Sequence, residues 1–365
     1  MSDTETLPIP ETGTDWDINQ LVRENIKALK PYRSARDDFS SGILLDANEN
    51  AYGSPFEKES ELNRYPDPYQ TEFREKYAQF RGIRKEQVFT GVGSDEAIDL
   101  LIRIFCEPGR DRILITPPTY GMYSVASAAN NTAIDKVLLT ENFQLDPEKV
   151  LEAVTPETRL LFLCSPNNPT GNTLEPEAIA HILANFNGIV VVDEAYIDFS
   201  AQPSLAGWLQ YFSNLVVLQT LSKSFGLAGI RLGVALGSEK LVNWMLRVKA
   251  PYNVNRLTLS YASKALDKTE WFENTISQII EQRDWLAGQL HELPGVERVF
   301  PSSANFLLVK IPGAYEWYQK LAAEGVIVRY RGNEPHCEET LRISVGTPEQ
   351  NRLLISTLKQ LMETA

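Results

Sequence analysis

Between about residues 88 and 236, short runs of β-branched and other apolar residues alternate with segments whose apolar residues recur at helical spacing. The six runs are QVFTGV, RILIT, RLLFLC, GIVVVD, NLVVLQT and LGVALG. Strands that are apolar almost throughout, rather than at every second position, are typical of a sheet covered by helices on both faces. Strands that alternate with helical segments such as DEAIDLLIRIFCE and LEPEAIAHILANF form parallel βαβ units. This region therefore predicts an α/β fold with a mainly parallel sheet.

The pattern changes after about residue 255. A long helical stretch over 270–293 precedes three strand-like runs and two further helical segments, at 304–311, 325–330, 340–346, 314–325 and from about 348. We expect an N-terminal arm over 1–40, a large domain over 41–255 and a smaller α+β domain over 256–365. About the first fifteen residues are acidic and rich in proline and threonine, and we expect them to be disordered.

Composition narrows the class of protein. The chain has 365 residues, enough for about two domains, and a net charge of -13, which argues against nucleic acid as a general partner. No apolar run reaches the roughly 18 residues of a membrane helix, and the N-terminus resembles neither a signal nor a transit peptide, so we expect a cytoplasmic protein. The three cysteines form no C-x-x-C pair, and the three histidines have no metal-ligand spacing. We therefore expect buried, reduced cysteines and no metal site.

Polar residues follow five of the predicted strands. GVGSDEA, PPTYGMY and SPNNPTG come directly after strand-like runs, Asp193 ends another run, and Lys223 follows the next one. Open α/β sheets bind their ligands at the carboxyl ends of the strands. Five such strand ends together predict one shared ligand site.

Two of these segments have an ordinary structural interpretation as well as a functional one. GVGSDEA is not a dinucleotide fingerprint, because Glu96 occupies the position of the third glycine. Gly93, Ser94 and Asp95 are consistent with an anion site at a helix N-terminus, or with a helix that Ser94 or Asp95 simply caps. SPNNPTG is consistent with a plain turn, or with Asn168 directing its amide at a ligand oxygen.

Asp193 and Lys223 are harder to explain as structural residues. A carboxylate at the end of a buried strand needs a partner, either an arginine or a protonated nitrogen of a ligand, and Tyr196 is close by in the chain. Lys223 lies in TLSKSFGLAGIRLG, where no acidic neighbour stabilises its ammonium form. Unless it is a surface lysine, it is suited to act as a base and to form a Schiff base with a carbonyl.

The neighbours of Lys223 complete a ligand description. Thr220, Ser222 and Arg231 are of the types that bind phosphate. A carbonyl, a phosphate, a ring nitrogen that needs a carboxylate and a ring hydroxyl that needs Tyr196 or Asn168 together describe pyridoxal 5′-phosphate.

The motifs SPNNPTG, DEAYIDF, TLSKSFGLAGIRLG and LRISVGT, in this order, resemble those of the fold-type I aminotransferases that depend on pyridoxal phosphate. The segments LKPYRSAR, DANENAYG, NRYPDPYQ, PPTYGMYSV and GIRLG resemble more narrowly those of the histidinol-phosphate aminotransferases. The resemblance extends from about residue 18 to residue 361. Two departures, Ala51 in place of a common proline and Ser224 in place of a common alanine, remove no functional group.

The resemblance implies a role for each matched residue. Lys223 would carry the cofactor and act as the catalytic base, Asp193 would pair with the ring nitrogen, and Tyr196 would form a hydrogen bond with the 3′ oxygen attached to the ring. The remaining cofactor ligands would be Ser94, Asp95, Tyr120, Asn168, Thr220, Ser222 and Arg231, with Tyr65 reaching the cofactor of a neighbouring subunit in a homodimer. The substrate would contact Tyr32, Asn48, Arg329 and Arg342, of which Arg329 and Tyr32 would discriminate between substrates.

The reaction implied by the resemblance is amino transfer from L-histidinol phosphate to 2-oxoglutarate, which gives imidazole acetol phosphate and L-glutamate in histidine biosynthesis. Three alternatives stay open from the sequence. The chain could be an aromatic amino acid aminotransferase, an enzyme similar to threonine-phosphate decarboxylase, or a regulator that keeps the fold without catalysis.

Overall fold

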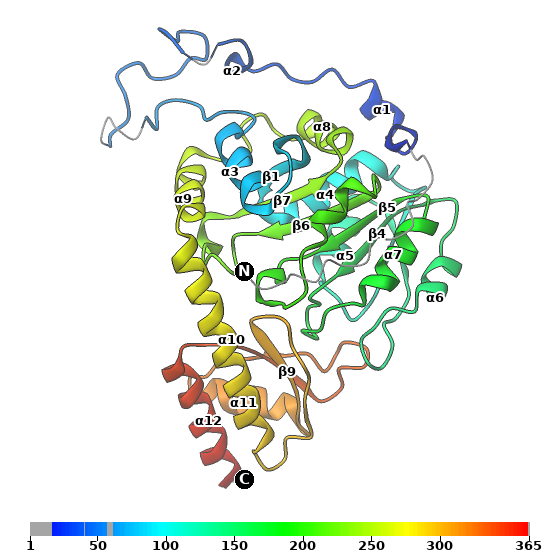
Figure 1. Cartoon of the computed structure of the whole chain (residues 1–365), viewed down its shortest axis with the longest axis vertical. Helices are drawn as coiled ribbons and strands as arrows, with labels where there is room; N and C mark the ends of the chain where they lie inside the picture. The colour runs from blue at the N-terminus through cyan, green and yellow to red at the C-terminus, as the bar shows by residue number, and fades with distance from the viewer. Residues whose placement is uncertain (1–16, 40, 57–60, 364–365) are drawn as a thin grey trace.

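The computed structural model describes residues 17–39, 41–56 and 61–363, so the expected disordered lead-in lies outside the described residues. Its centre is a seven-stranded sheet with the order β1-β7-β6-β5-β4-β2-β3 (Figure 1). The strands are β1 (Val88–Val92), β2 (Arg112–Ile115), β3 (Ala133–Lys136), β4 (Thr158–Cys164), β5 (Ile189–Asp193), β6 (Leu215–Thr220) and β7 (Leu232–Gly237).

The sheet is mainly parallel, as the sequence predicts. Strands β2 to β6 pair in parallel, whereas β7 is antiparallel to both of its neighbours, β6 and β1. All six apolar runs form strands. β3 was not anticipated, because this edge strand has the sequence AIDK and contains no apolar run.

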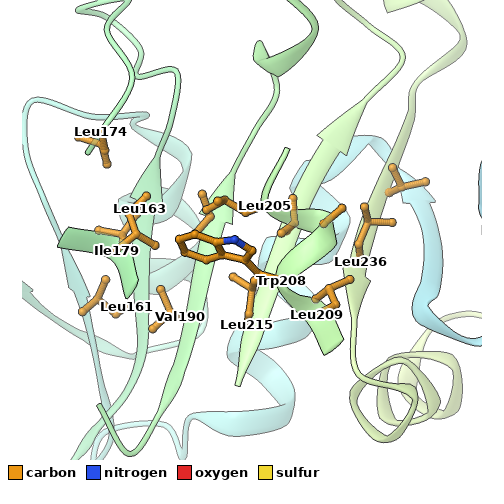
Figure 2. Packing of buried hydrophobic residues seen from close by; sticks show 14 of the residues in the cluster. Leu161, Leu163, Leu174, Ile179, Val190, Leu205, Trp208, Leu209, Leu215 and Leu236 are labelled. Atoms are coloured by element: carbon orange, nitrogen blue, oxygen red, sulfur yellow. The ribbon is translucent and has the colours of Figure 1, made fainter. Parts of the chain in front are cut away.

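Helices cover both faces of the large sheet, which explains why its inner strands are apolar at consecutive positions. Val190 and Val192 of β5 pack into one core, and Ile189 and Val191 pack into the other. The first core also contains Trp208, which Figure 2 shows among leucines of the strands and of the segment around it. The covering helices are α3 (Thr71–Arg81), α4 (Gly93–Phe105), α5 (Met122–Ala129), α6 (Pro147–Glu152), α7 (Pro176–Asn185), α8 (Glu239–Val248) and α9 (Arg256–Leu266).

A second, four-stranded antiparallel sheet with the order β10-β11-β9-β8 has its own apolar core. Its elements are α10 (Thr269–His291), β8 (Arg298–Val299), β9 (Phe306–Lys310), α11 (Ala314–Ala323), β10 (Arg329–Tyr330), β11 (Thr340–Ser344) and α12 (Pro348–Glu363). Figure 1 shows α10 running from beside α9 to this smaller sheet. The fold class is therefore confirmed, while the domain limits proposed from the sequence stay a prediction.

In the described residues before α3, the helices are short: the 3-10 helix η1 (Ile18–Gln20), α1 (Glu24–Lys27) and α2 (Ala35–Asp38). Figure 1 shows this segment as an extended arm at the top of the view, beyond α3 and α8. Several large apolar side chains in it are exposed, with Ile43 at 92% and Leu45 at 81%. An arm with so much exposed apolar surface is typical of a segment that contacts another chain.

Three further observations bear on the class of protein. In the described part of the chain, no helix is long and apolar enough to cross a membrane. Cys106, Cys164 and Cys337 are buried and unpaired, as expected. Within residues 17–39, 41–56 and 61–363, no cluster of three His, Cys, Asp or Glu side chains could hold a metal ion.

Candidate active site

The residues that follow the parallel strands line a cavity of about 270 Å³ at one edge of the large sheet. β7 runs in the opposite direction and begins at this edge, which places Arg231 there as well. Every cofactor-binding residue expected from the resemblance lines this cavity except Tyr65. Arg342 reaches it from β11 of the smaller sheet, so both sheets contribute to the cavity.

One end of the cavity is formed by the N-terminus of α4. The residue in the N-cap position is Val92, and no side chain caps the helix, so the interpretation of Ser94 or Asp95 as the cap is wrong. The first N–H groups of the helix therefore have no intrahelical partner, and the positive end of the helix dipole lies at the cavity. Arg231 Nη2 lies 3.6 Å from Asp95 Oδ2 and adds a positive charge at the same end.

Two glycines allow this end of the cavity to form. Gly233 of β7 pairs with Thr220, and a Cβ atom at Gly233 would lie 2.1 Å from the backbone nitrogen of Ser94. Gly93 has a φ of 70°, in the left-handed region, and a Cβ atom there would lie 3.0 Å from Arg231 Nη2. Helix, strand and guanidinium can approach this closely only because both positions lack a side chain.

The hydroxyls beside Lys223 are arranged around the same end. Thr220 Oγ1 lies 3.0 Å from Ser222 Oγ and accepts a hydrogen bond of 3.1 Å from the backbone N–H of Ser222. Backbone N–H groups, hydroxyls and a guanidinium are the donors that proteins use for phosphate. This end of the cavity is therefore suited to bind a phosphate group.

Asp193 lies deep in the cavity and is 3% exposed. Its carboxylate accepts hydrogen bonds from the Tyr123 hydroxyl at 2.9 Å and from the Ala195 N–H at 3.1 Å, but forms no ion pair with any described residue. Burial raises the pKa of Asp193 to about 6. The sequence allowed two partners for Asp193, an arginine or a protonated ligand nitrogen. No described arginine pairs with it, so a positively charged ligand nitrogen would supply the missing partner.

Tyr123 is a residue that the sequence analysis missed. It is fully buried in α5, stacks on Phe162 at 4.8 Å between ring centroids and donates to Asp193. The signal was present in PPTYGMY, whose two tyrosines are three residues apart and so lie on neighbouring faces of the turn that starts α5. The other, Tyr120, lines the cavity and donates to Asp95 at 3.1 Å.

The Lys223 side chain opens into the cavity and forms no ion pair or hydrogen bond with the described residues. Its Nζ lies 5.7 Å from the centre of the Tyr196 ring. Burial, together with the positive charges of Arg342 and Arg231, lowers the pKa of Lys223. A larger fraction of this amine is therefore neutral, and able to act as a nucleophile or a base, than for a lysine in water.

Asn168 connects the two sheets at the cavity. Its side-chain oxygen accepts a hydrogen bond of 2.5 Å from Arg342 Nη1, and its amide nitrogen lies 3.5 Å from the Tyr196 hydroxyl. The Tyr196 ring packs edge-on against Phe306, and Arg342 lies over the same phenylalanine. SPNNPTG is thus more than a turn, because its amide holds an arginine of the other sheet.

The substrate residues expected from the resemblance do not all reach this cavity. Arg329 pairs with Arg342 across β10 and β11, but it is exposed and does not line the cavity. Arg331, which the sequence analysis did not select, lines it instead. Side chains alternate along an extended chain, so Arg329 and Arg331 lie on the same face. The sequence alone therefore did not indicate which of the two reaches the cavity.

Tyr32, Asn48 and Tyr65 also lie away from Lys223 within one chain. Tyr32 is 74% exposed. Asn48 and Tyr65 line a separate cavity of about 430 Å³, and Tyr65 stacks on Tyr252 with 4.5 Å between ring centroids. Their predicted contacts with cofactor and substrate therefore need a second subunit.

Comparison with known proteins identifies the family. Residues 37–358 match the family described as aminotransferase class I and II. The chain belongs to this family. It is 47% identical over 347 residues to the histidinol-phosphate aminotransferase of Parabacteroides distasonis, covering 94% of this chain and 99% of the relative, and 46% identical over 351 residues to that of Flavobacterium johnsoniae, covering 95% and 99%. The structure of the Sinorhizobium meliloti histidinol-phosphate aminotransferase in complex with pyridoxal-5'-phosphate has the same fold, with a TM-score of 0.75 at 22% identity over 87% of this chain and 90% of that one.

The cavity of this aminotransferase fits pyridoxal phosphate, the cofactor of the family. The uncapped N-terminus of α4 and Arg231 would hold the phosphate. Asp193, buried without a cation, would hold the protonated ring nitrogen, and the unpaired amine of Lys223 would bond to the aldehyde carbon. Each polar group of the ligand has a complementary group in the cavity.

Proposed function

We propose that this aminotransferase transfers the amino group of L-histidinol phosphate to 2-oxoglutarate, giving imidazole acetol phosphate and L-glutamate, as a step of histidine biosynthesis. The observation that supports amino transfer is one cavity that contains both an unpaired lysine amine and a buried carboxylate without a cation. The choice of substrate is supported by curated relatives, 42% to 47% identical over nearly the whole chain, that carry the name histidinol-phosphate aminotransferase.

The residues around the cavity would divide the proton transfers between them. When bound, pyridoxal phosphate supplies an acceptor for the electron pair that remains after the substrate Cα–H bond breaks. Lys223 Nζ takes the proton from Cα, which its lowered pKa favours. The Asp193 carboxylate stays ionised and holds a proton on the ring nitrogen, and Tyr123 fixes its orientation.

Arginines would bind the anionic end of each substrate. Histidinol phosphate carries a phosphate where amino acids carry a carboxylate, and glutamate must use the same cavity. Arg342 is positioned for either anion because the Asn168 oxygen orients its guanidinium. Arg329 and Tyr32 remain predicted substrate contacts, with Arg329 located beside Arg342 on the neighbouring strand.

The working enzyme would be a cytoplasmic homodimer. Tyr32, Asn48 and Tyr65 lie outside the Lys223 cavity of their own chain, and the arm around Tyr32 exposes apolar side chains such as Ile43. A second copy would cover this surface and receive these residues in its own active site, as a closed twofold dimer allows.

The test is to incubate the cofactor-loaded protein with L-histidinol phosphate and 2-oxoglutarate and to follow glutamate formation. Lys223→Ala serves as the inactive control, and L-threonine phosphate and L-phenylalanine serve as competing substrates. The proposal predicts that kcat/KM is highest for histidinol phosphate. Release of carbon dioxide from threonine phosphate, or a clear preference for phenylalanine, would reject the proposed substrate.

A further inference from the structure

Arg331 differs from the other described arginines whose Nε atom is buried without a hydrogen-bond partner. Five arginines in the described part of the chain have a buried Nε atom without a hydrogen-bond partner. Four of them neutralise their charge with an acidic residue, in the pairs Arg36–Asp46, Arg81–Asp198, Arg159–Asp111 and Arg256–Glu61. The fifth, Arg331, forms no ion pair with any described residue, although it is only partly exposed.

The surroundings of Arg331 make this missing partner costly. Arg331 and Arg342 both line the Lys223 cavity. Burial lowers the pKa of Arg331, and so does the positive charge of Arg329, whereas Glu334 raises it. Burial and the positive charge of Arg331 lower the pKa of Arg342. Arg329 lies two residues before Arg331 and pairs with Arg342 across β10 and β11, so its positive charge repels that of Arg331. Partly buried cations that repel one another are unfavourable unless an anion binds between them.

Backbone structure holds Arg331 in this position. Its N–H donates to the Thr340 carbonyl at 3.0 Å, which extends the pairing of β10 with β11 by one residue. Val328 and Tyr330 contact the core of the small sheet, so the side chain of Arg331 extends from the opposite face. The sheet therefore fixes the backbone position from which the Arg331 side chain reaches the cavity.

We propose that Arg331, together with Arg342, binds the phosphate of the amino-group donor. This inference rests on the proposed function and refines it, because it assigns the phosphate to a residue inside the cavity. A dianion placed between the two guanidiniums would neutralise both, and it would give the buried Nε of Arg331 the acceptor that the protein does not provide.

The experiment compares three variants of the cofactor-loaded enzyme, Arg331→Gln, Arg331→Lys and Arg352→Gln. Arg352 is exposed on α12 and serves as the control for removing one positive charge. Each variant is assayed with L-histidinol phosphate and with L-histidinol, which has the same amine but no phosphate. The inhibition constant of inorganic phosphate gives a second readout, because it reports on phosphate binding and not on the size of kcat.

Arg331→Gln should lower kcat/KM for histidinol phosphate roughly ten- to a hundredfold, mainly through KM, because a charge-assisted contact is lost. The value for histidinol should stay unchanged, inhibition by inorganic phosphate should weaken, and Arg331→Lys should recover part of the loss. The Arg352→Gln control should match the wild type.

Two results would overturn the inference, and they differ from failure of the proposed function. Equal losses for histidinol phosphate and histidinol would mean that Arg331 only supports the structure of the cavity. A wild-type level of activity in Arg331→Gln would mean that the phosphate lies elsewhere. A wild-type enzyme that does not use histidinol phosphate at all would reject both proposals.

Discussion

Replacing Asp193 with asparagine should stabilise the cofactor-free protein while it abolishes amino transfer. Burial raises the pKa of this carboxyl from its ordinary value of 3.8 to about 6. A shift of about 2 units corresponds to roughly 3 kcal/mol, because one unit is worth about 1.4 kcal/mol. Asparagine has the same shape and carries no charge, so it avoids most of this cost. The wild-type residue therefore lowers stability in exchange for function.

The sign of the pH dependence follows from the direction of the shift. Well below pH 3.8 the carboxyl of Asp193 is protonated in both the folded and the unfolded chain, and its burial then costs no ionisation energy. As the pH rises from there to about 6, the unfolded chain ionises first, so the folded state loses up to roughly 3 kcal/mol. Above about pH 6 the cost is constant.

Urea unfolding of the cofactor-free wild type and of Asp193→Asn, between pH 4 and pH 8, measures this difference. The variant should gain stability relative to the wild type as the pH rises, with the gain complete near pH 7. Glu194, whose pKa burial also raises, is present in both proteins and cancels in the comparison. Added pyridoxal phosphate should stabilise the wild type more than the variant. A difference between the two proteins that does not vary with pH would refute this account of Asp193.

Four further substitutions test the site. Lys223→Ala should abolish amino transfer and the cofactor adduct that borohydride reduces, and an adduct on another lysine would contradict that role. Tyr65→Ala, mixed with Lys223→Ala, should regain activity if Tyr65 acts across a dimer interface, whereas sedimentation of an active monomer would exclude the dimer. Arg329→Ala should lower kcat/KM for histidinol phosphate about tenfold, and less for phenylalanine, if it contacts phosphate. Gly233→Ala should cost several kcal/mol in urea unfolding, because its Cβ would lie 2.1 Å from a backbone nitrogen, and near-wild-type stability would mean that the backbone can move.

The large sheet was predictable because burial on both faces leaves a continuous apolar run in the sequence. Val190, Val191 and Val192 show this directly, since successive residues enter different cores. β3 and β8 have no continuous apolar run in the sequence. They are short edge strands with exposed or partly exposed residues, and they are extended because a neighbouring strand pairs with them.

The location of the site was predictable for a related reason, since parallel strands must end at the same edge of the sheet. The sequence alone therefore predicted that Asp193 and Lys223 lie close together, and both line the same cavity. The choice between Arg329 and Arg331 could not be made in this way. It depends on how the small sheet is placed against the large one, and that placement arises from contacts distant in sequence, such as that of Arg342 with Asn168.

The hairpin of β6 and β7 carries Lys223 and Arg231 in a single loop that is closed at its base. Thr220 pairs with Gly233, and the Leu221 N–H donates to the Leu232 carbonyl at 3.2 Å. With both ends fixed, the number of residues in the loop sets the separation between the amine and the guanidinium. An insertion or deletion here would change that separation at once, whereas surface loops elsewhere absorb length changes easily. We therefore expect attempts to graft or shorten segments of this protein to succeed outside residues 221–232 and to fail within them.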